Sequence, residues 1–151
     1  MITIDVANEQ SHVEFDERRF RRAVEMILED AGKSAATVSL AVVDDEAMAR
    51  LHLRYLGKDE ATDVLSFPLK DDDGPLEGEV VVNAETAANV ADWYRWTPED
   101  ELLLYVIHGV LHLAGYRDMT PEEKAAMQQQ QRYYLTRLGV DGHFDAPDDD
   151  G

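Results

Sequence analysis

The segment Thr97–Ala114, TPEDELLLYVIHGVLHLA, combines a helix start, an apolar run and two histidines. Thr97 followed by proline is typical of the first turn of a helix, where the missing N–H of proline costs nothing. The apolar run Leu102–Ile107 is the longest in the chain, yet it is far too short to cross a membrane. We therefore expect an interior helix at the centre of the fold, which carries His108 and His112 near its end.

Apolar patterns on either side of this helix predict the other elements. Strands are expected near residues 2–6, 37–44, 63–69 and 79–83, and helices near residues 15–32, 45–57, 84–94 and 120–138. The strand at 37–44 is expected to be buried on both faces, and Pro68 indicates an edge strand or a strand end. The turn-rich loop at 71–75 suggests that the strands beside it form an antiparallel pair. The order β-α-β-α-β-β-α-α-α predicts an α+β fold or a mixed α/β sandwich, with about four strands and about five helices.

The composition excludes several classes of protein. The chain has 151 residues, enough for one domain, and its 32 Asp and Glu against 14 Lys and Arg give a formal charge of -18. This charge excludes a protein held on nucleic acid or anionic lipid by bulk positive charge. The chain has no cysteine, which excludes disulfides, thiolate metal sites and cysteine nucleophiles. We expect a single domain at residues 1–139 and an acidic disordered tail at 140–151. Because residues 1–5 lack the pattern of a signal peptide, we expect a cytoplasmic location.

The two histidines predict a metal site. Residues four apart lie one turn apart on one face of a helix, so His108 and His112 can reach one ion. Gly115 allows the chain to reverse after the helix, and Asp118 can return as a third ligand. Two imidazoles, a carboxylate and an open position are typical of a hydrolytic zinc site. We therefore expect one divalent metal ion, with zinc as the first choice.

Other interpretations compete with a hydrolytic zinc site. Two histidines four residues apart in a helix often bind no metal, and instead pack in the interior or lie at a solvated surface. A zinc peptidase is disfavoured, because the glutamate that such enzymes need would stand at position 109, where the chain has glycine. An iron-dependent oxygenase with two histidines and one carboxylate fits the ligand types, but such sites normally lie in β-barrels.

Longer motifs add a family resemblance. HGVLHLAGY at 108–116 and TDVLSFPL at 62–69 flank a Gly-acidic-aliphatic segment at 76–80. In type and order these motifs resemble the YbeY family of metal-dependent endoribonucleases, over a span from about residue 37 to residue 135. The resemblance implies an α+β sandwich with a four-stranded sheet and a zinc-like ion in a cleft. It also implies cleavage of single-stranded RNA and work on the small ribosomal subunit.

Carried over residue by residue, the resemblance makes His108 and His112 the first two metal ligands. The third ligand of the family is usually histidine, and its position here is Asp118, which can also bind zinc. The preceding position is usually acidic but here is Arg117, which could contact phosphate or be a solvated turn residue. The family usually has an arginine before the Gly-Lys-Asp turn at 57–59, and Leu56 stands at that position here. The guanidinium expected to bind the scissile phosphate is therefore missing there.

Basic side chains near that turn are candidates for RNA binding. Arg50, Arg54 and Lys58 follow one another at intervals of four residues and form one stripe if the helix extends that far. Such a stripe is more often a solvated face than a binding surface. Together with Arg117, these residues are the expected RNA contacts.

The sequence thus predicts a hydrolase, a metal-dependent endoribonuclease that acts in rRNA maturation and ribosome quality control. Its expected partners are single-stranded RNA, as a precursor of rRNA, and the small ribosomal subunit, but neither DNA nor a membrane. No side chain is assigned as the general base. The alternative is a ribosome-associated binding factor with a structural metal site and little nuclease activity.

Overall fold

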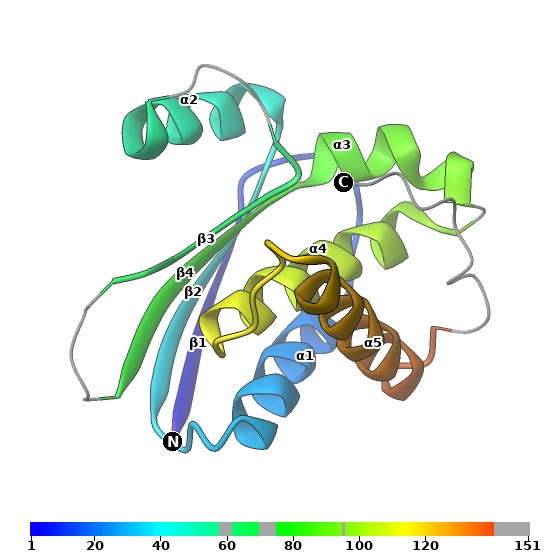
Figure 1. Cartoon of the computed structure of the whole chain (residues 1–151). Coiled ribbons are helices and arrows are strands. Elements are labelled where there is room, and N and C mark those ends of the chain that lie inside the picture. Colours follow the sequence, from blue (N-terminus) through cyan, green and yellow to red (C-terminus); the bar gives the residue numbers. More distant parts are fainter. Residues whose placement is uncertain (58–61, 70–74, 95, 141–151) are drawn as a thin grey trace.

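The computed structural model describes residues 1–57, 62–69, 75–94 and 96–140 (Figure 1). Of the tail expected at 140–151, the described part is Val140, which is buried. The division into a domain and a disordered tail therefore stays a prediction.

In the described part of the chain, four strands form one mixed sheet. They are β1 (Ile2–Asn8), β2 (Ala36–Val43), β3 (Val64–Pro68) and β4 (Leu76–Asn83), in the order β1-β2-β4-β3. The strands β1, β2 and β4 run parallel, whereas β3 runs antiparallel to β4, as predicted from the loop between them. Pro68 ends the edge strand β3, where its missing N–H does not interrupt a central ladder. β4 begins at Leu76 rather than at residue 79, because it continues the ladder with β2 down to Ala36.

Five α-helices accompany the sheet within the described residues. They are α1 (Glu17–Asp30), α2 (Asp45–Leu56), α3 (Ala84–Val90), α4 (Pro98–Leu113) and α5 (Pro121–Arg137). A short 3-10 helix, η1 (Ala91–Tyr94), follows α3, so the segment expected as one helix changes its winding halfway. Thr97 and Thr120 cap α4 and α5, and Glu123 completes the predicted capping box at Thr120. The predicted α+β fold, with a mixed sheet and five helices, is confirmed.

The helices cover the two faces of the sheet unequally. The helices α1, α3, α4 and α5 lie on one face, and α2 lies on the other (Figure 1). On the α2 side, Met48 packs with Val43, Leu65 and Val81 into a small cluster. The expectation that β2 is buried on both faces is therefore wrong for its first half. Thr37 is exposed, because α2 covers the strand only near its C-terminal end.

The predicted interior helix, α4, lies at the centre of the larger helical layer. It contacts α1, α3, α5, β3 and β4. Its fully buried apolar side chains are Leu102, Leu103, Val106, Ile107, Val110 and Leu111. None of the helices in the described ranges is long and apolar enough to cross a membrane.

Close contact between α4 and β4 requires a glycine in the helix. A Cβ atom on Gly109 would lie 2.6 Å from Cγ1 of Val80, whose β-branched side chain is stiff. The carbonyl oxygen of Gly109 also accepts a hydrogen bond of 2.8 Å from the hydroxyl of Ser66 on β3. The absence of a glutamate at position 109 thus has a packing reason.

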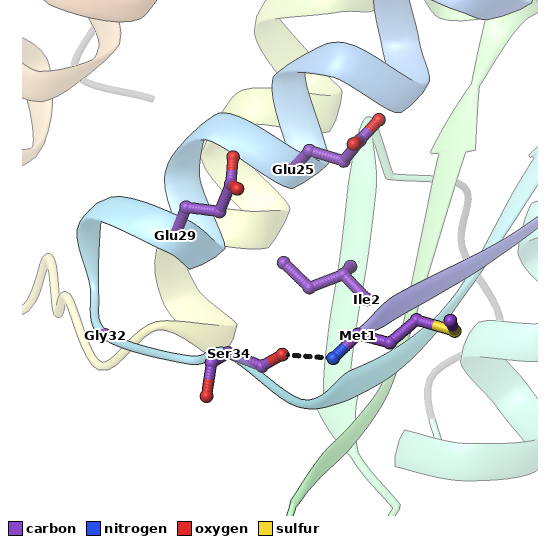
Figure 2. Close-up of a pocket in the computed structure, with 6 residues that line it drawn as sticks. All are labelled: Met1, Ile2, Glu25, Glu29, Gly32 and Ser34. Carbon is purple, nitrogen blue, oxygen red and sulfur yellow. Dashed lines mark hydrogen bonds between the residues drawn. The ribbon is translucent and has the colours of Figure 1, made fainter.

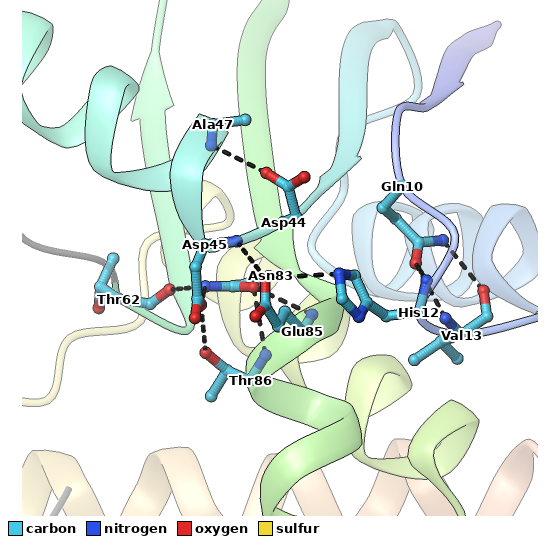
Figure 3. A network of polar contacts seen from close by, with 10 residues as sticks. All are labelled: Gln10, His12, Val13, Asp44, Asp45, Ala47, Thr62, Asn83, Glu85 and Thr86. Carbon is cyan, nitrogen blue, oxygen red and sulfur yellow. Dashed lines mark hydrogen bonds and ion pairs between the residues drawn. The ribbon is translucent and has the colours of Figure 1, made fainter.

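A polar network around the buried Asn83 joins the C-terminal end of β4 to α2 and α3 (Figure 3). The amide nitrogen of the fully buried Asn83 donates to Asp45 at 2.7 Å and to the carbonyl of Thr62 at 3.1 Å. Its amide oxygen accepts from the backbone N–H groups of Glu85 and Thr86. Because a buried amide is stable only when its groups are paired, this network fixes the starts of α2 and α3 relative to β3.

Candidate metal centre

The end of α4 reverses the chain, so that the residues after it return to the helix. Gly115 has a φ of 109°, in the left-handed region that favours glycine. Its N–H donates to the carbonyl of His112 at 3.1 Å, and the N–H of Tyr116 donates to the carbonyl of Leu111 at 3.0 Å. These bonds satisfy carbonyls that a helix end leaves without an intrahelical partner. The turn brings Asp118 back beside the two histidines.

Three possible ligand atoms converge at this turn. Nε2 of His108 and Nε2 of His112 are 3.1 Å apart. Oδ2 of Asp118 lies 3.4 Å from the first nitrogen and 3.3 Å from the second. Among the residues that the structure describes, this is the one group of three potential ligands whose ligand atoms lie so close together. The fold therefore brings together the three residues predicted to bind a metal ion.

The other ring nitrogens determine where the imidazole protons lie. Nδ1 of His108 is 2.7 Å from Oε1 of Gln131, and Nδ1 of His112 is 3.0 Å from the carbonyl oxygen of Tyr116. Amide oxygens can only accept, so each Nδ1 carries a proton and donates it. The Nε2 lone pairs of both rings are then free to face a common point. Such a hydrogen bond from the second nitrogen is typical of histidines that ligate a metal.

The donor set fits a divalent ion. Two nitrogen lone pairs beside a carboxylate oxygen repel one another unless a cation lies between them. A tetrahedral ion with bonds of about 2.0–2.1 Å sets its ligand atoms about 3.3–3.4 Å apart. The three separations found here, 3.1, 3.3 and 3.4 Å, are close to that spacing. Imidazole and carboxylate are both ligands that zinc accepts.

The centre is partly open to solvent. The side chains of His108, His112 and Asp118 are 25%, 30% and 34% exposed. Three protein ligands leave one position of a tetrahedral ion for water or substrate. Partial exposure lets such a molecule reach that position, so the arrangement suits Lewis-acid chemistry on an exogenous substrate.

Arg117 is the predicted RNA contact that lies beside the metal centre. It directly precedes Asp118, and its largely exposed guanidinium lies 3.7 Å from a carboxylate oxygen of Glu123. An exposed ion pair of this length contributes little to stability. The guanidinium can therefore turn toward an anion that approaches the centre.

Two of the other predicted RNA contacts, Arg50 and Arg54, belong to α2, on the opposite face of the sheet from α4 (Figure 1). The guanidinium of Arg50 pairs with Glu46 at 2.9 Å, and that of Arg54 lies 5.6 Å from the centre of the Tyr55 ring. Lys58 lies outside the described residues. The structure does not bring Arg50 and Arg54 to the metal centre, and their role in RNA binding stays a prediction.

Gln131 is a part of the centre that the sequence pattern did not single out. It belongs to a run of four glutamines at 128–131, and the fold decides which of them faces His108. Gln131 lies four residues after Met127 and three before Tyr134, both of which are buried. This helical spacing would have indicated that Gln131 lies on the inward face of the helix.

A hollow of about 600 Å³ lies elsewhere in the structure. Its lining residues are Met1, Ile2, Glu25, Glu29, Gly32 and Ser34 (Figure 2). The ammonium group of Met1 donates to the carbonyl of Ser34 at 2.6 Å. None of the predicted site residues that the structure describes lines this hollow, so its size does not make it the functional site.

Comparison with known proteins relates the chain to one family. The family profile described as Endoribonuclease YbeY matches residues 5–139. The chain is 37% identical over 141 residues to Endoribonuclease YbeY of Carboxydothermus hydrogenoformans, covering 91% of this chain and 98% of that one. It is 33% identical over 143 residues to Endoribonuclease YbeY of Salinibacter ruber, covering 89% and 91% of the two chains. The solution structure of TM1509 from Thermotoga maritima has a similar fold, with a TM-score of 0.63 and 28% identity, covering 91% of this chain and 89% of that one.

Proposed function

The chain belongs to the Endoribonuclease YbeY family, and on this premise we propose that it is a metal-dependent hydrolase that cleaves single-stranded RNA. The convergence of ligand atoms from His108, His112 and Asp118 is the observation that carries the metal dependence. Members of the family bear the name endoribonuclease, which supports RNA as the substrate. On the resemblance of the motifs, the substrate is a precursor of rRNA on the small ribosomal subunit in the cytoplasm. The enzyme would then serve rRNA maturation and ribosome quality control.

The residues of the centre divide into ligands and groups that orient them. His108, His112 and Asp118 would hold one divalent ion, and the ligand types favour zinc. When bound, such an ion supplies a Lewis acid that polarises a phosphoryl oxygen and lowers the pKa of water. Gln131 and the carbonyl of Tyr116 hold the two imidazoles in one tautomer and one orientation.

Local groups must attract the RNA, because the chain as a whole is acidic. A formal charge of -18 opposes the approach of a polyanion and gives no bulk counterion release. The metal centre, Arg117 and a ribosomal partner can supply attraction at the place of reaction. We therefore expect weak affinity for random RNA and recognition that depends on the ribosomal context.

Metal content and RNA cleavage, measured side by side in the wild type and in His112→Ala, test the proposal. The ring of His112 is partly exposed at the end of α4, so its removal should leave the fold intact, as circular dichroism can show. We expect one zinc ion per chain in wild type purified without chelator, together with cleavage of a single-stranded RNA. We expect both to be lost in His112→Ala.

A histidine outside the centre provides the matched control. His12 is half-exposed and lies 3.4 Å from Glu85, in the network at the start of α3 (Figure 3). His12→Ala should keep both the metal and the activity. Cleavage by His112→Ala at the wild-type rate would contradict the proposal, as would a wild type that binds no divalent metal.

The exposed side chain of Leu56 favours the alternative, a ribosome-associated binding factor with a structural metal. Leu56 lies in the last turn of α2, at the position where the resemblance led us to expect an arginine. An apolar side chain has neither a positive charge nor a hydrogen-bond donor with which to bind a phosphate. For a binding factor, chelation should lower the midpoint of thermal unfolding, with no cleavage to lose. Cleavage that a chelator abolishes while the fold persists supports the enzyme instead.

A further inference from the structure

A hollow of about 180 Å³ lies between the C-terminal end of α1, the turn after α4, and α5. Tyr116, Tyr133 and Tyr134 line it, together with Asp30 and Gln130. Its volume is below the roughly 300–1,000 Å³ of pockets that enclose a whole small molecule. The hollow is therefore of a size for one planar ring rather than for a complete nucleotide.

The hollow and the metal centre share the turn after α4 and neighbouring residues of α5. The carbonyl oxygen of Tyr116 accepts a hydrogen bond of 3.0 Å from Nδ1 of His112. The same residue lines the hollow. On α5, Gln131 contacts His108 at 2.7 Å, and the neighbouring Gln130 lines the hollow. An RNA strand with a phosphate at the metal centre thus has a neighbouring base within reach of the hollow.

The tyrosine rings offer a surface on which a base can stack. Tyr116 and Tyr133 are 36% and 48% exposed, so their rings are accessible. The rings of Tyr133 and Tyr134 meet edge to face with centroids 4.9 Å apart, and the guanidinium of Arg137 lies 5.5 Å from the centroid of Tyr133. These contacts hold the rings in place before a ligand arrives. Unpaired RNA bases stack on such aromatic side chains and on guanidinium planes.

Asp30 gives the hollow a polar edge that only accepts hydrogen bonds. Its Oδ2 accepts from the hydroxyl of Tyr134 at 2.7 Å and lies 3.7 Å from a guanidinium nitrogen of Arg137. Burial raises the pKa of Tyr134, so this hydroxyl keeps its proton and donates. A carboxylate has about four acceptor sites, more than these two contacts use. Guanine presents two adjacent N–H donors on its Watson–Crick edge, whereas uracil presents one N–H between two carbonyl oxygens, which a carboxylate repels.

We propose that this hollow is a nucleobase subsite, which binds a base near the scissile phosphate and prefers guanine. The subsite rests on the proposed function, because RNA is the ligand expected at the neighbouring centre. The base stacks on the rings of Tyr116 and Tyr133, and its N–H donors face Asp30. The subsite thus selects the nucleotide next to the point of cleavage.

Nucleoside binding to the metal-loaded protein tests the subsite without requiring cleavage. Guanosine and uridine carry no phosphate, so their binding does not depend on attraction of phosphate to the metal centre. In NMR titrations, we expect guanosine to shift the tyrosine ring signals and to bind at least about fivefold more tightly than uridine. Tyr133→Ala should weaken guanosine binding about tenfold or more, and Asp30→Asn should remove the preference over uridine. Trp93→Ala, which removes an exposed ring on η1, is the matched control and should bind guanosine as the wild type does.

Cleavage of an oligouridine that contains one guanosine extends the test to RNA. We expect the wild type to cut at a fixed distance from the guanosine. Tyr133→Ala should lose this positional preference and raise KM about tenfold, with kcat little changed. These outcomes would show that the subsite binds the base of an RNA strand and not only a free nucleoside.

The outcomes separate a failure of the subsite from a failure of the proposed function. Equal binding of guanosine and uridine, or unchanged guanosine binding in Tyr133→Ala, overturns the subsite. Unchanged RNA cleavage in Tyr133→Ala overturns it too, and leaves the proposed function standing. Guanosine binding through Tyr133 without any RNA cleavage by the wild type overturns the proposed function, and leaves a nucleoside site.

Discussion

Replacement of Gln131 by methionine removes the hydrogen bond that orients His108 while keeping the length of the side chain. Oε1 of Gln131 lies 2.7 Å from Nδ1 of the ring. Loss of such a partner typically lowers metal affinity about 10- to 100-fold, which corresponds to about 1.4–2.7 kcal/mol. The side chain of His108 is a quarter exposed, so water can replace part of the lost bond. We therefore expect the lower half of that range, about 10- to 30-fold.

Competition for zinc against a chelator of known affinity measures this loss. Gln129→Met is the matched control, because Gln129 belongs to the same run on α5 but is exposed. The two metal-free variants should unfold at the same temperature, since Gln131 is only partly buried. Gln131→Glu should bind zinc more tightly than the wild type, because a carboxylate is the stronger acceptor. If Gln131→Met binds zinc as tightly as Gln129→Met does, the assignment of the imidazole protons is refuted.

Three other changes test the fold around the centre. Gly109→Ala places a Cβ atom 2.6 Å from Val80 and should lower the free energy of unfolding in urea by about 1–3 kcal/mol; unchanged stability would contradict the close contact of α4 with β4. Thr120→Ala removes half of the capping box and should cost about 1 kcal/mol, which Thr120→Ser should restore. Burial and the hydrogen bond to Asp30 raise the pKa of Tyr134 above 10.0, its ordinary value. This contribution to stability is therefore complete below pH 10 and is lost as the pH rises above it. The unfolding temperature of the wild type should therefore fall as the pH rises above 10, and it should fall less in Tyr134→Phe. An equal fall of the unfolding temperature in both proteins would rule this contribution out.

Local signals in the sequence were sufficient for most of the secondary structure. Thr97 and Thr120 cap their helices as predicted, because a cap depends on neighbouring residues alone. Pro68 marked the edge strand for the same kind of reason, since its ring removes a ladder donor wherever it stands. The pair His108 and His112 needed no more than helical periodicity to be placed on one face.

Features that depend on tertiary packing were beyond the sequence pattern. The exposure of Thr37 depends on where α2 crosses the sheet. That position cannot be predicted from the residues of β2. Gln131 stands among identical neighbours, and its contact with His108 depends on the angle between α4 and α5. The separation of Arg50 and Arg54 from the metal centre likewise reflects the topology of the sheet, which puts α2 on its far face.

All three predicted ligands of the centre come from the segment 108–118, which reverses at Gly115. An ion bound there closes loops of only a few residues, so it removes little chain entropy from the unfolded state. It cross-links no distant elements of the fold, and its one link to another helix runs through Gln131. Removal of the ion should therefore speed amide hydrogen exchange at the end of α4 and in the turn, while the sheet stays protected. We therefore expect the scaffold to fold without the ion and to bind it afterwards.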